Sequence, residues 1–374
     1  MMKEEILQLW LNNIEEIGLK TISNLIQAFG NVFNIYDAPE KLVEKYLTNS
    51  QKNKFIQSKN LDKYIEMDMK LKERGIDVIY PGHKMYPDKL LNIYAPPRLL
   101  YVRGKLNEKI YSCDGNIAVV GGRSPSVYGK EVCKMFGRDF GTFGINVISG
   151  MARGIDSMAH IGAIEAGGYT LAILGSGIDV PYPKENTELY SRILENGAII
   201  SEYGLGVHPD KGTFPMRNRI ISGLSDGVLV VEARKKSGSL ITAEYALEQG
   251  KQIYAVPGRL KDRCCEGSNN LIKSGAYCVL DAKDIVMDLK REIEMKCQQF
   301  ELGEMDESEK WTDKIPLAPV EEMVYSCLSL EPKYIDNIIQ GTGLGVTKTI
   351  SVLFTMEEKG LIKQPVNGYY IVAI

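Results

Sequence analysis

Two arginines stand where a helix is expected to begin, at the positive end of the helix dipole. Residues 213–219 have the sequence TFPMRNR, in which Thr213 can cap the helix and Pro215 suits its first turn. Cations at this end of a helix need an anion nearby. That anion is either an internal carboxylate, with Glu202 and Glu232 as candidates, or a ligand phosphate.

Helix geometry separates the two arginines. Arg217 and Arg219 are two positions apart, about 200° around a helix, so both cannot face the same groove. We expect Arg217 to face a ligand and Arg219 to pair with a buried carboxylate. The sequence leaves the reverse assignment open, and both arginines are kept as candidate phosphate contacts.

Basic, hydroxyl and glycine residues follow five of the expected strands. Glycines let an anion approach the backbone, and arginine offers a fork of donors. In chain order these turns supply Gly121, Gly122, Arg123, Arg153, Lys184, Arg217, Arg219, Ser237 and Gly238. The last two follow a basic run at 234–236, a pattern that is also typical of a solvated loop. Five such turns at one edge of a sheet predict a groove that follows phosphates.

Other kinds of site lack their usual patterns. The first turn is not GxGxxG, and the second strand ends in Ser149-Gly150, where a dinucleotide site needs an acid. His160 has no accompanying nucleophile motif and is expected to be structural, and Asp156 is expected to cap a helix. Seven cysteines without CxxC spacing indicate no metal site. We therefore expect no catalytic residue, no metal and no cofactor.

Seven short apolar runs alternate with helical stretches from residue 116 onward. The runs are 117–120, 145–148, 170–174, 198–200, 227–231, 252–256 and 277–280. Near-continuous apolar strands have both faces covered, and regular alternation with helices predicts an α/β fold with a doubly wound, mostly parallel sheet. Its ligand crevice should lie at the carboxyl ends of the strands. Before these runs, a proline-rich bridge should hold an edge strand near 99–102.

Helical spacing dominates both ends of the chain. Residues 6–71 predict a small helical domain, and residues 319–374 predict three helices and a hairpin with an Asn367-Gly368 turn, the pattern of a winged helix. We expect four parts: a helical domain (1–75), the sheet domain (76–288), a charged linker (289–314) and the winged helix (315–374).

Composition limits where a polyanion can bind. The chain has 374 residues and a net charge of −3, so a nucleic-acid contact must be a local basic patch. No charged-then-apolar leader and no run long enough to cross a bilayer is found, so we expect a cytoplasmic protein without membrane contact.

Several segments resemble the DNA-processing protein A family, also called DprA or Smf. They are 121–123 (GGR), 149–156 (SGMARGID), 182–186 (YPKEN), 214–219 (FPMRNR), 237–243 (SGSLITA) and 255–258 (AVPG). The resemblance covers the whole sheet domain in order. It implies an extended Rossmann-like fold and a homodimer that is not an enzyme. It further implies a recombination mediator that binds and protects incoming single-stranded DNA and loads RecA recombinase during natural transformation.

The resemblance also implies site residues. It assigns Arg123, Lys184, Arg217 and Asn218 to the single-strand pocket, together with backbone amides near Gly121 and Gly150. The family usually has Gly-Ser-Arg in the first turn. Here Gly122 replaces the serine, so a hydroxyl contact to phosphate is expected to be lost.

The flanking domains carry weaker signals. The first resembles SAM and helix-hairpin-helix domains, with Ile17-Gly18-Leu19-Lys20 in place of the hairpin but without its second glycine. In the winged helix, the third helix has Lys348 and Lys359 but also Glu357 and Glu358. This balance favours a protein or dimer contact at least as much as the reading of a DNA groove.

An enzyme is the alternative. Residues 237–244 (SGSLITAE) distantly resemble the PGGxGTxxE loop of nucleotide phosphoribohydrolases, which share this sheet topology, and Glu244 would then be the acid. The proline and the central glycines of that loop are absent. A nucleotide-binding or nucleoside-monophosphate phosphoribohydrolase-like activity on the same fold is therefore the second hypothesis.

Overall fold

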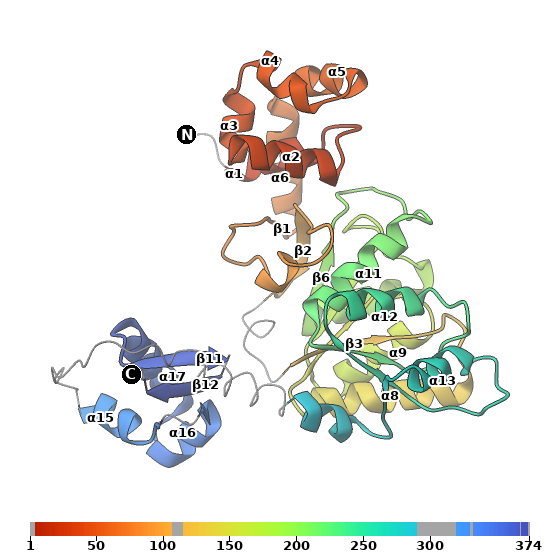
Figure 1. The fold of residues 1–374 in the computed structure, drawn as a ribbon, viewed down its shortest axis with the longest axis vertical. Coiled ribbons are helices and arrows are strands. Elements are labelled where there is room, and N and C mark those ends of the chain that lie inside the picture. The colour runs from red at the N-terminus through yellow and green to blue at the C-terminus, as the bar shows by residue number, and fades with distance from the viewer. Residues whose placement is uncertain (1–3, 107–114, 290–318, 330–331, 367, 373–374) are drawn as a thin grey trace. The chain divides into compact units, whose positions relative to one another are not determined.

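The computed structural model describes residues 4–106, 115–289, 319–329, 332–366 and 368–372. Contacts divide this part of the chain into two compact units, the first ending at Ala282 and the second beginning at Lys283. The expected linker, 289–314, lies outside the described residues except for Leu289. Figure 1 shows the fold of each unit.

A nine-stranded sheet forms the centre of the first unit, in the order β1-β2-β6-β5-β4-β3-β7-β8-β9. Strands β3 to β9 run parallel, whereas β2 is antiparallel to both β1 and β6. The strands are β1 (Ile76–Ile79), β2 (Leu100–Gly104), β3 (Asn116–Val120), β4 (Asn146–Ser149), β5 (Thr170–Leu174), β6 (Gly197–Ser201), β7 (Gly227–Val230), β8 (Gln252–Ala255) and β9 (Tyr277–Cys278). The prediction of a mostly parallel α/β sheet is confirmed.

Helices cover both faces of this sheet, which is why its central strands, β3 to β7, are buried along their whole length. Figure 1 shows α11 and α12 on one face and α8 and α9 on the other. The flanking elements are α8 (Val127–Thr142), α9 (Ile155–Glu165), η3 (Lys184–Asn186), α10 (Thr187–Asn196), α11 (Thr213–Leu224), α12 (Ser239–Glu248) and α13 (Glu266–Lys273). From β3, successive strands of the chain are added on one side as β4, β5 and β6, and the next strand, β7, lies on the other side. The direction in which strands are added therefore reverses between the neighbours β3 and β7. Doubly wound sheets bind ligands beyond the strand ends at such a reversal.

Short helices precede the sheet and are drawn in red and orange in Figure 1. They are α1 (Glu4–Asn12), α2 (Leu19–Phe29), α3 (Val32–Asp37), α4 (Glu40–Val43), η1 (Glu44–Tyr46), α5 (Asn49–Gln57), α6 (Asp62–Glu73) and, after β1, η2 (Asp88–Leu90). One apolar core joins them to the sheet, from Trp10 and Leu25 to Tyr101 and Ile199. The Asn13 side chain also donates a hydrogen bond to the Tyr101 hydroxyl over 3.1 Å.

Two strand predictions are wrong. The strand near 99–102 is not an edge strand, because β2 pairs with β1 on one side and with β6 on the other. No sequence pattern predicted β1, whose four residues lie in the segment interpreted as irregular. The run 277–280 forms only the two-residue strand β9, and both of its residues are exposed at the sheet edge rather than covered on both faces.

From Pro319 onward, the described part of the second unit has three helices and a small sheet. Its elements are α15 (Pro319–Ser326), β10 (Lys333–Tyr334), α16 (Ile335–Thr342), α17 (Val346–Glu358), β11 (Ile362–Val366) and β12 (Tyr369–Val372), with the strand order β10-β12-β11. Val324, Ile338, Leu353 and Met356 form its core. In the expected turn, Asn367 lies outside the described residues and Gly368 has a φ of 83°.

Membrane-spanning segments were also considered. Among the described residues, every helix is too short or too polar to cross a bilayer.

Candidate nucleic-acid interface

A groove lies beyond the carboxyl ends of the strands, at the reversal of strand order. It consists of a larger cavity of about 680 Å³ and a smaller cavity of about 270 Å³. The two share six lining residues, namely Arg123, Ser124, Ala152, Tyr182, Phe214 and Arg217. The crevice predicted from strand alternation is therefore present, and we call these two cavities together the groove.

The turn after β3 forms one wall of the groove. Gly121 packs so closely on Ile155 and on the Glu232 carbonyl that a Cβ there would lie 2.6 Å from the isoleucine side chain. This contact holds the turn against α9 and the end of β7. Arg123 follows it, exposed, with its guanidinium 5.0 Å from the centre of the Phe214 ring. It forms no ion pair with any described residue, so its charge is available to a ligand.

Arg217 enters the groove from the first turns of α11 and is only 5% exposed. Its Nη1 atom donates to the carbonyl of Gly150, over 2.7 Å, and to that of Ile173, and its Nε donates to the Asn218 side chain. Gly150 must be glycine here, because a Cβ would lie 2.2 Å from Nη1. Burial lowers the pKa of Arg217 to about 10, so the guanidinium stays charged at neutral pH.

One buried carboxylate lies within electrostatic range of Arg217. Asp156 is 6% exposed and lines the larger cavity. Burial raises its pKa, and the Arg217 charge opposes that shift. Its Oδ2 accepts the Gly150 amide over 3.2 Å. Asp156 is thus not the N-cap that we expected, because Gly154 holds that position.

Arg219 points into the protein, not into the groove. Its side chain is completely buried, and Nη2 contacts both carboxylate oxygens of Glu202 at 2.6 Å. The expectation that Arg219 pairs with an internal carboxylate is confirmed, with Glu202 rather than Glu232 as the partner, whereas the ligand role of Arg217 stays a prediction. The candidate role of Arg219 as a phosphate contact is wrong, because no ligand can reach it.

Two backbone details correct the sequence-based site. The amides of Gly122 and Gly150 themselves are not free for phosphate, since Gly122 N donates to the Glu232 carbonyl over 2.6 Å and Gly150 N donates to Asp156. Thr213 does not cap α11 either. The helix begins at Thr213 after Gly212, and the threonine hydroxyl bonds to Asp210 and Gly175 instead.

The remaining predicted residues fall into two groups. Gly121, Gly122, Asn218, Ser237 and Gly238 line the larger cavity with Arg123 and Arg217, while Gly150 and Arg153 line the smaller one. The Asn218 amide also donates to the Gly238 carbonyl over 3.3 Å, which joins α11 to the turn after β7. Arg153 is exposed, and Glu185 partly neutralises it across a 2.8 Å bond.

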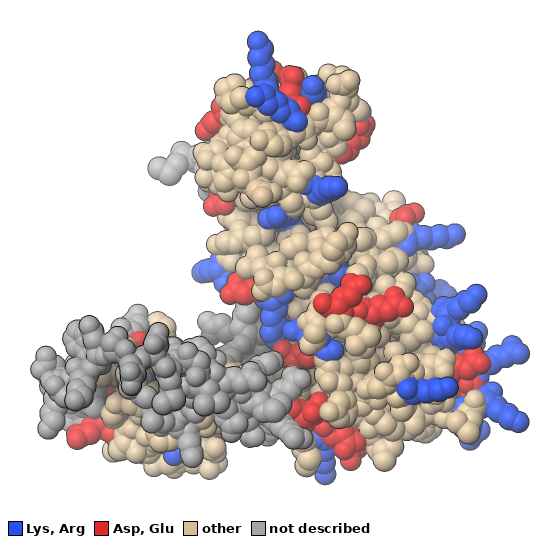
Figure 2. Space-filling model, in the orientation of Figure 1, with Lys and Arg blue, Asp and Glu red and all other residues tan. Residues whose placement is uncertain are grey.

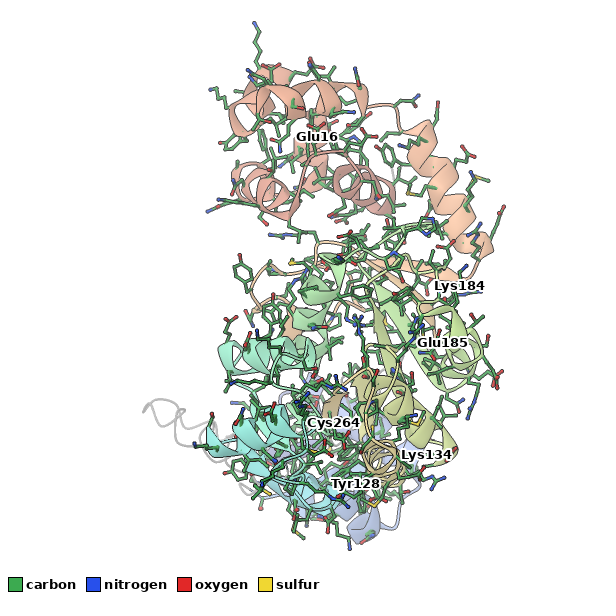
Figure 3. The ribbon with its side chains drawn as sticks, turned by 90° about the vertical axis from the view of Figure 1, so that its right-hand side faces the viewer. Glu16, Tyr128, Lys134, Lys184, Glu185 and Cys264 are labelled. Carbon is green, nitrogen blue, oxygen red and sulfur yellow. The ribbon has the colours of Figure 1, made fainter. Side chains whose placement is uncertain are left out.

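Lys184 lines neither cavity. It is exposed at the first position of η3, and Figure 3 places it with Glu185 at one margin of the first unit, away from Cys264, a lining residue of the larger cavity. Lys184 is thus not a lining residue, although its neighbour Pro183 lines the smaller cavity with Arg123 and Arg217.

Sequence reasoning assigned no ligand contact to Lys211, Tyr182 or Phe214, which all line the larger cavity. Lys211 is exposed and without an ion pair among the described residues. The Tyr182 and Phe214 rings lie 5.5 Å apart at 36°, and Tyr182 is 41% exposed. The sequence signal for these residues was an aromatic side chain in each of two strand-end turns, Tyr182 and Phe214, with Lys211 three positions before Phe214.

His160 is a structural residue, as expected. It is fully buried, and its Nδ1 atom lies 2.7 Å from the Thr170 hydroxyl. That hydroxyl donates to the Val147 carbonyl, so Nδ1 carries the proton and donates to it. Nε2 has no partner among the described residues, and burial lowers the pKa of His160 to about 3.

This shift predicts a pH-dependent stability. Between pH 6.5 and about 3 the unfolded chain binds one more proton than the folded one, so stability contributed by neutral His160 is lost as pH falls below 6.5, by up to ~1.4 kcal/mol per pH unit. The substitution His160→Asn removes this titration. Urea unfolding should show the variant's deficit against wild type shrinking by about 2–3 kcal/mol from pH 7.5 to 4.5. A constant deficit would show that His160 is not held neutral.

Comparison with known proteins assigns the chain to a family. Residues 77–290 match the family profile of DNA recombination-mediator protein A. The chain belongs to that family. It is 42% identical over 218 residues to DNA processing protein DprA of Bacillus subtilis strain 168, spanning 58% of this chain and 73% of that protein. It is 41% identical over 221 residues to protein Smf of Escherichia coli K12, and the match spans 59% of this chain and 58% of that protein.

Solved structures of family members share the fold. The X-ray structure of DNA processing protein A from Streptococcus pneumoniae superposes with a TM-score of 0.65 at 32% identity, covering 77% of this chain and 98% of that one. The structure of DNA processing protein A from Helicobacter pylori, described for its single-stranded DNA binding mode, superposes with a TM-score of 0.53 at 28% identity. The match covers 58% of this chain and 96% of that one. The resemblance identified from the strand-end motifs is confirmed.

Proposed function

We propose that the groove binds single-stranded DNA and that the protein acts as a recombination mediator in natural transformation. The observation that carries this proposal is the combination, in one groove, of the unpaired cations Arg123 and Lys211, the anchored cation Arg217 and the aromatic pair Tyr182 and Phe214. Proteins that bind single strands combine a basic path for the backbone with aromatic rings for the bases.

Each group has a defined part in this mechanism. Arg123 and Lys211 contact phosphates from exposed positions, and Arg217 presents a guanidinium whose remaining nitrogen, Nη2, makes no hydrogen bond to a described residue. The half-exposed Tyr182 ring offers its face to a base. Stacking tolerates any base and phosphate contacts carry no sequence information, so binding should be independent of sequence and sensitive to salt.

The acidic side chains of the groove do not oppose this role. Glu232 is 3% exposed, and its two carboxylate oxygens accept hydrogen bonds from the amide and the hydroxyl of Ser126, at 2.8 and 2.6 Å. Asp156 is buried and bound to the Gly150 amide. Their charges are therefore directed into the protein, while the cations are directed outward.

We infer that the protein is not an enzyme. The phosphoribohydrolase hypothesis requires Glu244 to act as an acid on a bound nucleotide. Glu244 is exposed on α12 and is absent from the residues that line the groove. Nothing favours this alternative, and incubation with nucleoside monophosphates tests it directly, since release of free base at an enzyme-like rate would establish a hydrolase.

The substitution Arg123→Ala tests the proposed site. It removes an unpaired guanidinium that borders both cavities, and we expect affinity for a single-stranded oligonucleotide to fall about tenfold or more at low salt, as measured by fluorescence anisotropy. Arg138→Ala is the matched control, because Arg138 is exposed on α8 and pairs with Glu165. We expect its affinity to stay within about twofold of wild type. Equal affinities for the two variants would remove Arg123 from the binding site.

Two protein partners belong to the proposal, a second copy of the chain and RecA recombinase. The exposed edge at β9, where Tyr277 is 54% exposed and Leu280 is 73% exposed, supports a contact between copies in the first unit. RecA is inferred from family membership alone and would place the protein in the cytoplasm. Light scattering that gives the monomer mass would contradict the first inference, and failure of purified RecA to be retained by the DNA-bound protein would contradict the second.

We also propose the four-part division of the chain. The end of α6 at Glu73 and the start of β1 at Ile76 support the boundary between a SAM-like helical domain (1–75) and the sheet domain (76–288). After the linker, the three helices and three strands of residues 319–372 support a winged helix within 315–374. Its helix α17 exposes Val346, Ile350 and Phe354 at four-residue intervals, which supports a protein contact over a DNA groove reader.

A further inference from the structure

Six exposed cations gather on two loops beside the groove. Arg234, Lys235 and Lys236 follow β7, and Arg259, Lys261 and Arg263 follow β8. We call these six residues the basic lobe. Strands β7 and β8 are parallel neighbours, so both loops leave the sheet at the same edge. Figure 2 shows Lys and Arg side chains gathered on the right-hand side of the first unit, where Figure 1 draws α13.

Backbone contacts fix the two loops against each other. The Gly267 amide, at the start of α13, donates to the Ala233 carbonyl over 2.6 Å, which ties the end of the second loop to the beginning of the first. Within the second loop, the Asp262 amide donates to the Arg259 carbonyl, and the Asp262 carboxylate accepts the Cys264 amide over 2.9 Å. The Asp262 carboxylate, at the centre of this loop, therefore accepts a hydrogen bond from within its own loop.

The charge of the lobe is not neutralised by the protein. Among the residues that the structure describes, no ion pair involves any of the six. Some other cations of the first unit are paired, since Lys134 and Arg138 pair with Glu165, and Arg153 pairs with Glu185. In a chain with a net charge of −3, six unpaired cations on two adjoining loops form the kind of local patch that attracts a polyanion.

The lobe continues the groove. Arg234 and Lys236 line the larger cavity, as does Cys264 beside Arg263, while Lys235, Arg259, Lys261 and Arg263 do not. A strand held in the larger cavity can therefore leave it between these two loops. We propose that the basic lobe is a second contact site, which binds the phosphates of the nucleotides flanking those held in the groove.

This inference rests on the proposed function and adds a dependence on strand length. A short oligonucleotide fills the groove alone, whereas a long one also covers the lobe. The test uses the full chain with the four substitutions Lys235→Ala, Arg259→Ala, Lys261→Ala and Arg263→Ala, none of which alters a lining residue of the groove. The probes are a six-nucleotide and a thirty-nucleotide single strand, lengths chosen because such sites hold on the order of 4–16 nucleotides.

We expect the variant to bind the long strand about tenfold or more weakly than wild type at low salt. Its plot of log affinity against log salt should be shallower by about 2 to 3, because each lost phosphate contact on a single strand contributes about 0.7. Affinity for the short strand should stay within about twofold. Its retained binding also reports that the variant is folded.

The control variant carries Lys20→Ala, Lys41→Ala, Lys45→Ala and Lys63→Ala, which remove the same charge from exposed positions of the N-terminal helices. It should bind both strands as wild type does. Wild-type binding of the long strand by the lobe variant would overturn the inference, and so would equal losses in the lobe and control variants. A loss on the short strand as large as on the long one would also overturn it, since the lobe would then belong to the groove. The proposed function fails separately, if Arg123→Ala binds the short strand normally.

Discussion

The substitution Glu202→Gln is expected to lower the free energy of unfolding by about 3–5 kcal/mol, the usual effect of leaving a buried charge without its partner. Arg219 is fully buried, and its Nε and Nη1 atoms have no hydrogen-bond partner among the described residues. Among the described residues, its charge is compensated by the contact of Nη2 with both oxygens of Glu202. Urea unfolding at neutral pH measures the loss.

A double variant separates this charge effect from packing. Arg219→Met combined with Glu202→Leu removes both charges and keeps apolar volume, so its stability should return to within about 1–2 kcal/mol of wild type. Affinity of the folded double variant for single-stranded DNA should be unchanged, because neither residue borders the groove. If Glu202→Gln alone were as stable as wild type, the pair would not be holding α11 to β6.

The substitution Arg217→Lys is expected to weaken single-stranded DNA binding about 10- to 100-fold, although it keeps the charge. The planar guanidinium is held by the carbonyls of Gly150 and Ile173 through Nη1 and by Asn218 through Nε. A lysine ammonium cannot make these bonds and also present a further donor in a fixed direction, a difference worth roughly 1.5–3 kcal/mol for bonds to charged groups. Anisotropy titrations measure the affinity.

Two measurements keep this effect distinct from unfolding. Circular dichroism at the titration temperature reports whether the variant is folded, and Arg138→Ala serves as the comparison, because Arg138 is exposed on α8, pairs with Glu165 and lines neither cavity. Arg217→Lys binding as tightly as wild type would mean that the fork geometry plays no part.

The sheet and the position of the groove could be predicted because their signals are local. Runs such as 117–120 (IAVV) are apolar at every position, and the turns after the strands carry glycine and arginine. The end of the sheet could not be predicted in the same way. β1 has only four residues within a proline-rich segment, and β9 is set by pairing with β8 rather than by burial of its own side chains.

The site itself depended on tertiary contacts that spacing does not show. Helix geometry separated Arg217 from Arg219, but choosing Glu202 over Glu232 required the arrangement of β6 and β7 beside α11. Lys184 and Lys211 looked alike in the sequence, since each lies in a turn after a strand. Only the fold shows that the turn before α11 carries Lys211 into the cavity wall, while η3 carries Lys184 outside it.

A salt titration of single-stranded DNA binding to wild type and to Arg123→Ala tests most directly the claim that cations of the groove hold phosphates. We predict that wild-type affinity falls steeply and linearly in a plot of log affinity against log salt. The Arg123→Ala line should lie lower at low salt and be shallower by about 0.7, the loss of one phosphate contact. Superimposable lines for the two proteins would contradict the assignment of this groove as the DNA-binding site.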